Sequence, residues 1–102
     1  METIDFDKLG GPVYAGRSKG ERARVQLGLD RMDKSQAPVQ IKIPEDTYSL
    51  NSSFFLGLFG PSVVNFRSRD AFLKKYVFEA PAVILEEIEK GIDRALAEVR
   101  PL

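Results

Sequence analysis

The chain has 102 residues, of which 43% are hydrophobic and 29% are charged, the proportions of an ordinary globular domain. Fifteen lysines and arginines balance fifteen aspartates and glutamates, so no surplus of positive charge favours nucleic acid or an anionic membrane as a partner. The absence of cysteine and histidine excludes a disulfide framework and removes the commonest metal ligand and general base, so we expect neither an enzyme nor a cofactor or metal site.

The N-terminal segment alternates apolar and polar side chains. Ile4 and Phe6 repeat with the period of two that indicates a half-buried strand ending before Gly10, and Val13–Tyr14 is a candidate hairpin partner. The first seven residues are acidic and lack the apolar stretch of a signal peptide. No run reaches the ~18 apolar residues of a membrane helix, so we expect a cytoplasmic protein.

A helix is predicted to begin near Lys19. Ser18 is followed three residues later by Glu21, the spacing of a capping box. The early apolar residues of this segment step by two, so a strand remains an alternative. The apolar set is Ala23, Val25, Leu27, Leu29 and Met32.

The clearest strand covers Val39–Ile43, where three β-branched residues alternate with polar ones between two prolines. Further along, Asn51, Ser52 and Ser53 have N-cap chemistry and precede an apolar run, which predicts a helix ended or kinked at Gly60-Pro61.

Three elements are predicted in the last third of the chain. Ser68 is positioned to cap a short helix, Val77–Phe78 favours a strand, and Pro81 suits the first turn of a final helix. The apolar stripe of that helix is Leu85, Ile88, Ile92, Ala95 and Val99.

Helices and strands therefore interleave in one α/β domain over residues 1–102. We expect a mixed sheet of about four strands with Val39–Ile43 central, covered by the helices that follow Ser18, Ser52 and Pro81. The predicted core includes Ile41, Ile43, Leu58, Ile88 and Ile92.

The run Tyr48–Phe59, which follows a strand and opens a helix, resembles the signature of the STAS superfamily. Together with Gly16–Ser18 and Phe59–Pro81, it is similar to a bacterial family of STAS-like domains of unknown function. The resemblance implies a small STAS-like regulatory fold. In the related anti-sigma-factor antagonists, a kinase phosphorylates one hydroxyl residue of this motif. Here Ser52 is the candidate phosphorylation site, with Ser53 next.

Two residues depart from the antagonist pattern: Asn51 replaces an aspartate and Phe54 replaces a glycine. Asn51, Ser52 and Ser53 also fit a purely structural interpretation, as the cap and first turn of a helix. The helix beyond them is apolar on nearly every side, so Phe54, Phe55 and Leu58 are candidate partner-interface residues. The alternative is that segments around Val63, Phe66 and Phe72 cover this helix.

The turn Gly16–Gly20 places Arg17 and Lys19 before a helix and suggests an anion site, although it lacks the order of a P-loop. Glu45-Asp46 and Glu86-Glu87-Glu89 are interpreted as solvated acids rather than metal ligands. The leading hypothesis is a phosphorylation-switched module that binds another protein, with a kinase-like ATPase or a second copy of the chain as candidates. The alternatives are a ligand or nucleotide sensor and a structural homo-oligomer.

Overall fold

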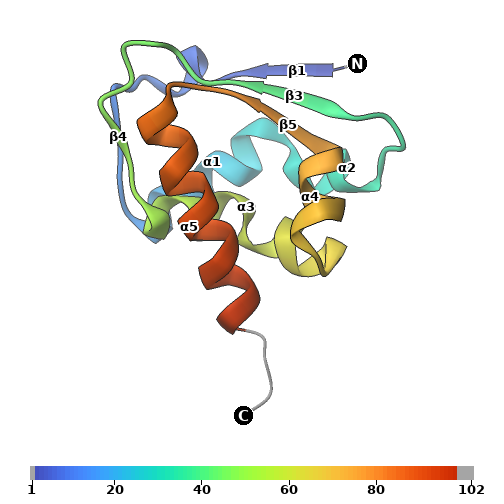
Figure 1. The fold of residues 1–102 in the computed structure, drawn as a ribbon. Coiled ribbons are helices and arrows are strands. Elements are labelled where there is room, and N and C mark those ends of the chain that lie inside the picture. The colour runs from blue at the N-terminus through green and yellow to red at the C-terminus, as the bar shows by residue number, and fades with distance from the viewer. Residues whose placement is uncertain (1, 99–102) are drawn as a thin grey trace.

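A three-stranded parallel sheet forms one layer of the protein (Figure 1). The structure is a computed structural model that describes residues 2–98. The strands are β1 (Glu2–Asp5), β3 (Val39–Lys42) and β5 (Tyr76–Glu79), in the order β1-β3-β5. The prediction that Val39–Ile43 is central is confirmed, because β3 pairs with both neighbours. Val39, Ile41 and Ile43 are buried, whereas Lys42 is exposed, as the alternation predicts.

The prediction of one mixed sheet of about four strands is wrong. Two further strands, β2 (Val13–Tyr14) and β4 (Ser49–Leu50), form a separate two-stranded parallel sheet. The hairpin between the first strand and Val13–Tyr14 is also absent. After β1 the chain turns through a 3-10 helix, η1 (Phe6–Leu9), and Pro12 has no N–H to donate to a ladder, so β2 leaves the first sheet.

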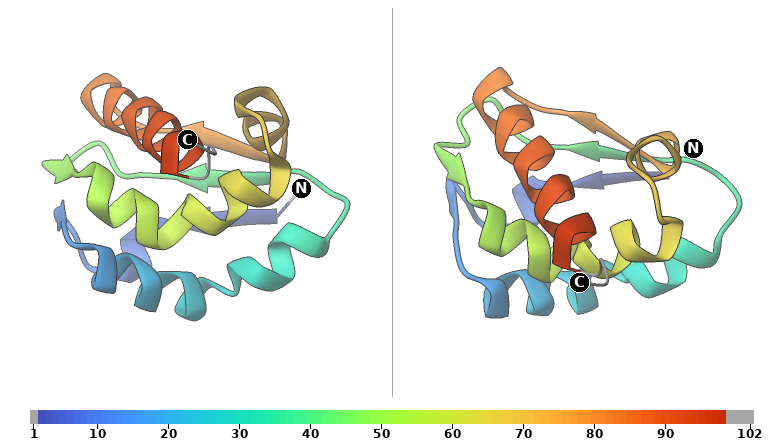
Figure 2. Two further views of the ribbon diagram at one scale, coloured as in Figure 1. Left: turned by 90° about the horizontal axis from the view of Figure 1, so that it is seen from below. Right: turned by 60° about the horizontal axis from the view of Figure 1, so that its bottom comes forward.

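All the described helices lie on the same side of the three-stranded sheet (Figures 1 and 2). They are α1 (Arg17–Leu27), α2 (Leu29–Lys34), α3 (Ser52–Phe66), α4 (Arg69–Lys75) and α5 (Ala82–Glu98). Figure 2 shows α3 between α1 and α5 when the molecule is viewed from the helix side. The α/β class is confirmed, with more helix and less sheet than we expected.

The structure confirms two of the predicted helix caps and contradicts a third. Asn51 accepts a hydrogen bond from the backbone N–H of Phe54, and Ser68 accepts one from that of Ala71, so both predicted caps are confirmed. The capping box at Ser18 is wrong, because α1 begins at Arg17 and its N-cap is Gly16, without a side-chain cap. Pro81 immediately precedes α5, and its carbonyl accepts hydrogen bonds from the first turn.

The prediction that Gly60-Pro61 ends or kinks the third helix is wrong about its end, because α3 continues through Pro61 to Phe66. Proline removes one backbone hydrogen bond from a helix interior. The cost is offset by burial on both sides of this position, where Leu58, Phe59, Ser62 and Val63 are all buried. Tertiary packing thus overrides a local helix breaker.

The α1 segment is helical, not extended, and it packs closely on α3 at two glycines. A Cβ atom on Gly20 would lie 2.2 Å from the Phe54 carbonyl oxygen, and one on Gly57 would lie 2.1 Å from that of Arg17. The two helix backbones therefore touch directly. Ala23, Leu29 and Met32 are buried as predicted, but Val25 is 80% exposed.

The prediction of the core is confirmed, because all five residues named for it are buried: Ile41, Ile43, Leu58, Ile88 and Ile92. In α5 the inward position at the start of the stripe is Ile84, 1% exposed, whereas the predicted Leu85 is 38% exposed. Ile88, Ile92 and Ala95 complete the buried stripe, and Val99 lies outside the described residues. Within residues 2–98, no helix has both the length and the apolar character required to cross a membrane.

Candidate functional site

The start of α3 places Ser52 beside an arginine from the far end of the chain. Parallel strands β2 and β4 run directly into α1 and α3, so the two helix N-termini lie at the same edge of the small sheet. The Ser52 hydroxyl is half-buried and accepts a hydrogen bond of 2.6 Å from Nη1 of Arg94, an exposed residue on α5. Asn51 is the cap, which leaves Ser52 free of that structural role. Ser53 is also half-buried.

The predicted partner-interface residues do not form a surface. Phe54, Phe55 and Leu58 are at most 3% exposed, so the expectation of an exposed apolar patch is wrong. The cover comes mainly from α1 and α5 rather than from the segments around Val63, Phe66 and Phe72 alone. The Phe55 ring packs on Gly91 of α5, where a Cβ atom would lie 2.3 Å from it.

The exposed apolar surface near Ser52 is instead a groove along the outer side of α3. Its volume is about 480 Å³. We call it the α3 groove; its apolar lining comes from Gly57, Gly60, Pro61 and Val64 of α3, Val25 of α1 and Ala95 of α5. It begins one helical turn beyond Ser52 and Ser53, and the ion pair of Arg17 with Glu98, 3.2 Å long, stands at its edge.

The two cations predicted to form an anion site point to different surfaces. Arg17 lines the α3 groove and pairs with Glu98, whereas Lys19 lines a cleft on the other side of α1. The physical reason is helix geometry: residues two apart on a helix do not face the same side. The structure therefore does not bring Arg17 and Lys19 together.

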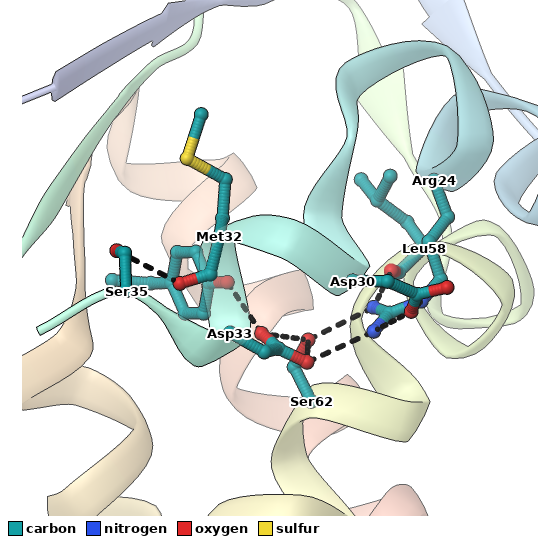
Figure 3. Close-up of polar contacts among 8 residues, drawn as sticks. Arg24, Asp30, Met32, Asp33, Ser35, Leu58 and Ser62 are labelled. Atoms are coloured by element: carbon teal, nitrogen blue, oxygen red, sulfur yellow. Dashed lines mark hydrogen bonds and ion pairs between the residues drawn. The ribbon is translucent and has the colours of Figure 1, made fainter.

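A buried polar cluster ties α1, α2 and α3 together, and we call it the Asp33 network. Figure 3 shows Asp33 in contact with both Ser62 and the guanidinium of Arg24, with Asp30 on the other side of the guanidinium. Arg24 donates to Asp33 at 2.9 Å, to Ser62 at 2.8 Å and to the Leu58 carbonyl at 2.9 Å. Within residues 2–98, no buried side-chain nitrogen or oxygen lacks a hydrogen-bond partner.

Tyr76 of β5 completes the Asp33 network by donating a hydrogen bond from its hydroxyl to Asp33. Burial raises the pKa of Tyr76 above its ordinary value, and the hydrogen bond to Asp33 raises it further. The buried donors and acceptors of this network are all paired, which holds the elements in register. On its outer side, Arg24, Asp30 and Asp33 line a surface pocket.

The acidic residues that we interpreted as solvated belong neither to the α3 groove nor to the Asp33 network. Glu45, Asp46, Glu86 and Glu89 are exposed. In the described part of the chain, no three acidic side chains lie close enough together to hold a metal ion.

Comparisons with family models, with curated proteins and with solved structures give no match for this chain. We therefore infer function from the geometry alone. Sequence reasoning did not identify Arg94 as part of the site. No local signal identifies it, because Arg94 and Ser52 are 42 residues apart. The α3 groove was missed for the same reason, since three helices contribute to it.

Proposed function

We propose that this protein is a regulatory module that binds another protein through the start of α3 and the α3 groove, and that phosphorylation of Ser52 switches the complex. The single observation that carries the proposal is the contact of the half-buried Ser52 hydroxyl with the exposed guanidinium of Arg94. It places a modifiable hydroxyl and a phosphate-binding cation together at a helix N-terminus.

The fold can accept a phosphate at Ser52. α3 has no acidic residue in its first turn, so the partial positive charge of its N-terminus is uncompensated there. A phosphoserine would add about −1.5 to −2 charges, which Arg94 and the helix start would stabilise. The charge presented to a partner would change while the domain stays folded.

The surface beside Ser52 is suited to a partner. Val25 and Val64 are exposed apolar side chains on opposite sides of the α3 groove, 80% and 38% exposed. A contact over the groove would remove both from water, and the groove begins one helical turn beyond Ser52. A STAS-like antagonist would use the same end of this helix, and a kinase-like ATPase fits as the partner that reads and modifies Ser52.

The test is a comparison of serine variants. Ser52→Asp should weaken binding of the partner isolated from cells of the source organism, because a carboxylate becomes desolvated at the interface. Ser52→Ala should bind as wild type does. Calorimetric titration of each variant with the purified partner gives the dissociation constants.

Ser18→Asp is the matched control, because Ser18 is exposed in the first turn of α1 and makes no hydrogen bond to an arginine within residues 2–98. If Ser52→Asp and Ser18→Asp bind equally well, the switch at Ser52 is refuted. Light scattering of the isolated protein separates a different partner from a second copy of the chain, since only the latter gives a dimer alone.

A further inference from the structure

A second surface, on the side of α1 opposite Arg17, combines cations with an apolar floor. This cleft lies between α1 and the η1–β2 segment and has a volume of about 330 Å³, within the ordinary range for small-ligand sites. We call it the Lys19 cleft. Its lining includes Leu9, Val13, Tyr14 and Phe54 on the apolar side and Lys19 and Arg22 on the polar side.

The floor of the Lys19 cleft is a fixed group of aromatic rings. The Tyr14 ring lies 5.6 Å from that of Phe6 and 5.3 Å from that of Phe54, measured between centroids. The Tyr14 hydroxyl donates to the Phe6 carbonyl at 3.0 Å and accepts from the backbone N–H of Gly11 at 3.1 Å. Because both ends of Tyr14 are held, the floor is formed before any ligand arrives.

The wall of the cleft carries positive charge that the chain does not neutralise. Lys19 and Arg22 are exposed and three residues apart, so they share one face of α1, where like charges repel. The positions three and four residues from each hold no acid, and no ion pair of either is found within residues 2–98. Asp7 and Asp46 do not line the Lys19 cleft but line a neighbouring cavity, which also borders Tyr14. An anion in the cleft would relieve the repulsion.

We propose that the Lys19 cleft binds a small amphiphilic anion, an apolar or aromatic group that carries one carboxylate, phosphate or sulfonate. The apolar part would lie over Tyr14 and Phe54. It would also cover Val13, which is 54% exposed. The anionic group would pair with Lys19 and Arg22. This site is independent of Ser52 and of the α3 groove, which lie on the other side of α1.

Two dyes of nearly the same shape test the proposal on the whole protein. 8-Anilino-1-naphthalenesulfonate has aromatic rings and one sulfonate, whereas N-phenyl-1-naphthylamine has the rings without the charge. The sulfonate dye should bind more tightly, and Lys19→Gln with Arg22→Gln should weaken it by about tenfold or more, because each lost charge-assisted contact accounts for about tenfold. Binding of the neutral dye should not change.

The control is Arg31→Gln with Lys34→Gln, which removes two exposed cations at the same spacing on α2. The proposal is overturned if this control weakens the sulfonate dye as much as the Lys19 and Arg22 variant does. It is also overturned if both dyes bind wild type equally. Circular dichroism and urea unfolding of each variant show whether the fold is retained, which these exposed positions predict.

Competition then identifies the source of the anion. Dissolved octanoate and vesicles of phosphatidylglycerol present the same pairing of an apolar chain with an anion. Displacement of the bound dye by octanoate assigns a free ligand, displacement by vesicles alone assigns a lipid surface, and displacement by neither overturns the proposal.

Discussion

Two serines on α3 each accept a hydrogen bond from an arginine, yet their surroundings differ. Ser62 is buried, and its partner Arg24 is also held by Asp33, whose side chain is 8% exposed. Ser52 is half-buried, and its partner Arg94 is exposed and comes from a different helix. A serine–arginine contact therefore stabilises the fold at Ser62, whereas a contact between the same residue types at Ser52 can change without disturbing the fold.

The difference lies in how many other groups depend on each contact. At Ser62, removal of any member leaves buried polar groups without partners, and such groups cost far more than a hydrogen bond contributes. At Ser52, water can replace the lost partner. The buried contact resists change, whereas the exposed one can change at little cost to the fold.

The largest effect is expected from breaking the Asp33 network. Asp33→Ala should lower the free energy of unfolding by about 3–5 kcal/mol, because it leaves the Arg24 guanidinium without its buried counter-ion and leaves Ser62 and Tyr76 without their shared acceptor. Asp30→Ala is the matched control: Asp30 pairs with the same arginine, but its side chain is 85% exposed, so the loss should stay below about 1 kcal/mol. Urea unfolding measures both, and equal losses would contradict the assigned role of Asp33.

The next largest loss of stability is expected at Ser62, and it can be compared directly with the loss at Ser52. Ser62→Ala should cost about 1–3 kcal/mol, because Arg24 and Asp33 each lose a buried hydrogen-bond partner. Ser52→Ala should cost less than about 0.5 kcal/mol, because Asn51, not Ser52, caps α3. Chemical denaturation of the two variants provides the measurement. A larger loss at Ser52 would reverse the comparison.

Alkaline pH should weaken the buried network. The pKa of Tyr76 is raised by burial and by Asp33, so the folded state holds this proton more tightly than the unfolded state does. Its contribution to stability is therefore complete below the unfolded value of about 10 and is lost as the pH rises above it. Burial also raises the pKa of Tyr14, which adds a second loss of the same sign.

Tyr76→Phe separates these two contributions. The variant should lose about 1 kcal/mol near neutral pH, where the hydrogen bond to Asp33 is removed. Between about pH 9 and 11 its stability should fall less steeply with pH than that of wild type, because one of the two perturbed protons is gone. Urea midpoints across this range give both slopes, and identical slopes would show that Tyr76 does not titrate in the unfolding reaction.

The smallest effect is a gain at the exposed serine. Ser52→Asp should stabilise the isolated protein by about 0.3–1 kcal/mol, because a negative charge is favourable at the start of α3 and beside Arg94. The gain should shrink as salt is added. Thermal melting at low and high ionic strength tests this. A net destabilisation would mean that the site cannot hold a negative charge.

Local chemistry predicted the elements well where one residue determines them. Asn51 and Ser68 cap helices because their side-chain oxygens reach a backbone N–H three residues ahead, a relation contained in the sequence. The alternation of apolar and polar residues in Val39–Ile43 likewise predicts which face of the strand is buried. The capping prediction at Ser18 is wrong because Gly16 is the N-cap of α1. Which of the two positions begins the helix is not contained in the local sequence, since α1 also packs closely on α3.

The candidate site was only partly predictable. Ser52 was identified from its position at a strand-to-helix junction, but Arg94 and the α3 groove were not. The predicted interface at Phe54, Phe55 and Leu58 is buried because α1 and α5 enclose α3. An apolar run shows that a helix must be covered, and it does not show whether the cover is the same chain or a partner.

The α/β class, the central strand, the core residues on β3 and α5, and the helix start that contains Ser52 could all be predicted from the order of the residues. These follow from periodicity and capping, which act within a few residues. Three relations become visible only once the helices are packed: Ser52 contacts Arg94, Arg24 is buried with Asp33, and Arg17 and Lys19 face different surfaces. The physical reason is that these relations depend on close backbone packing at Gly20 and Gly57, which sets how the helices lie against one another.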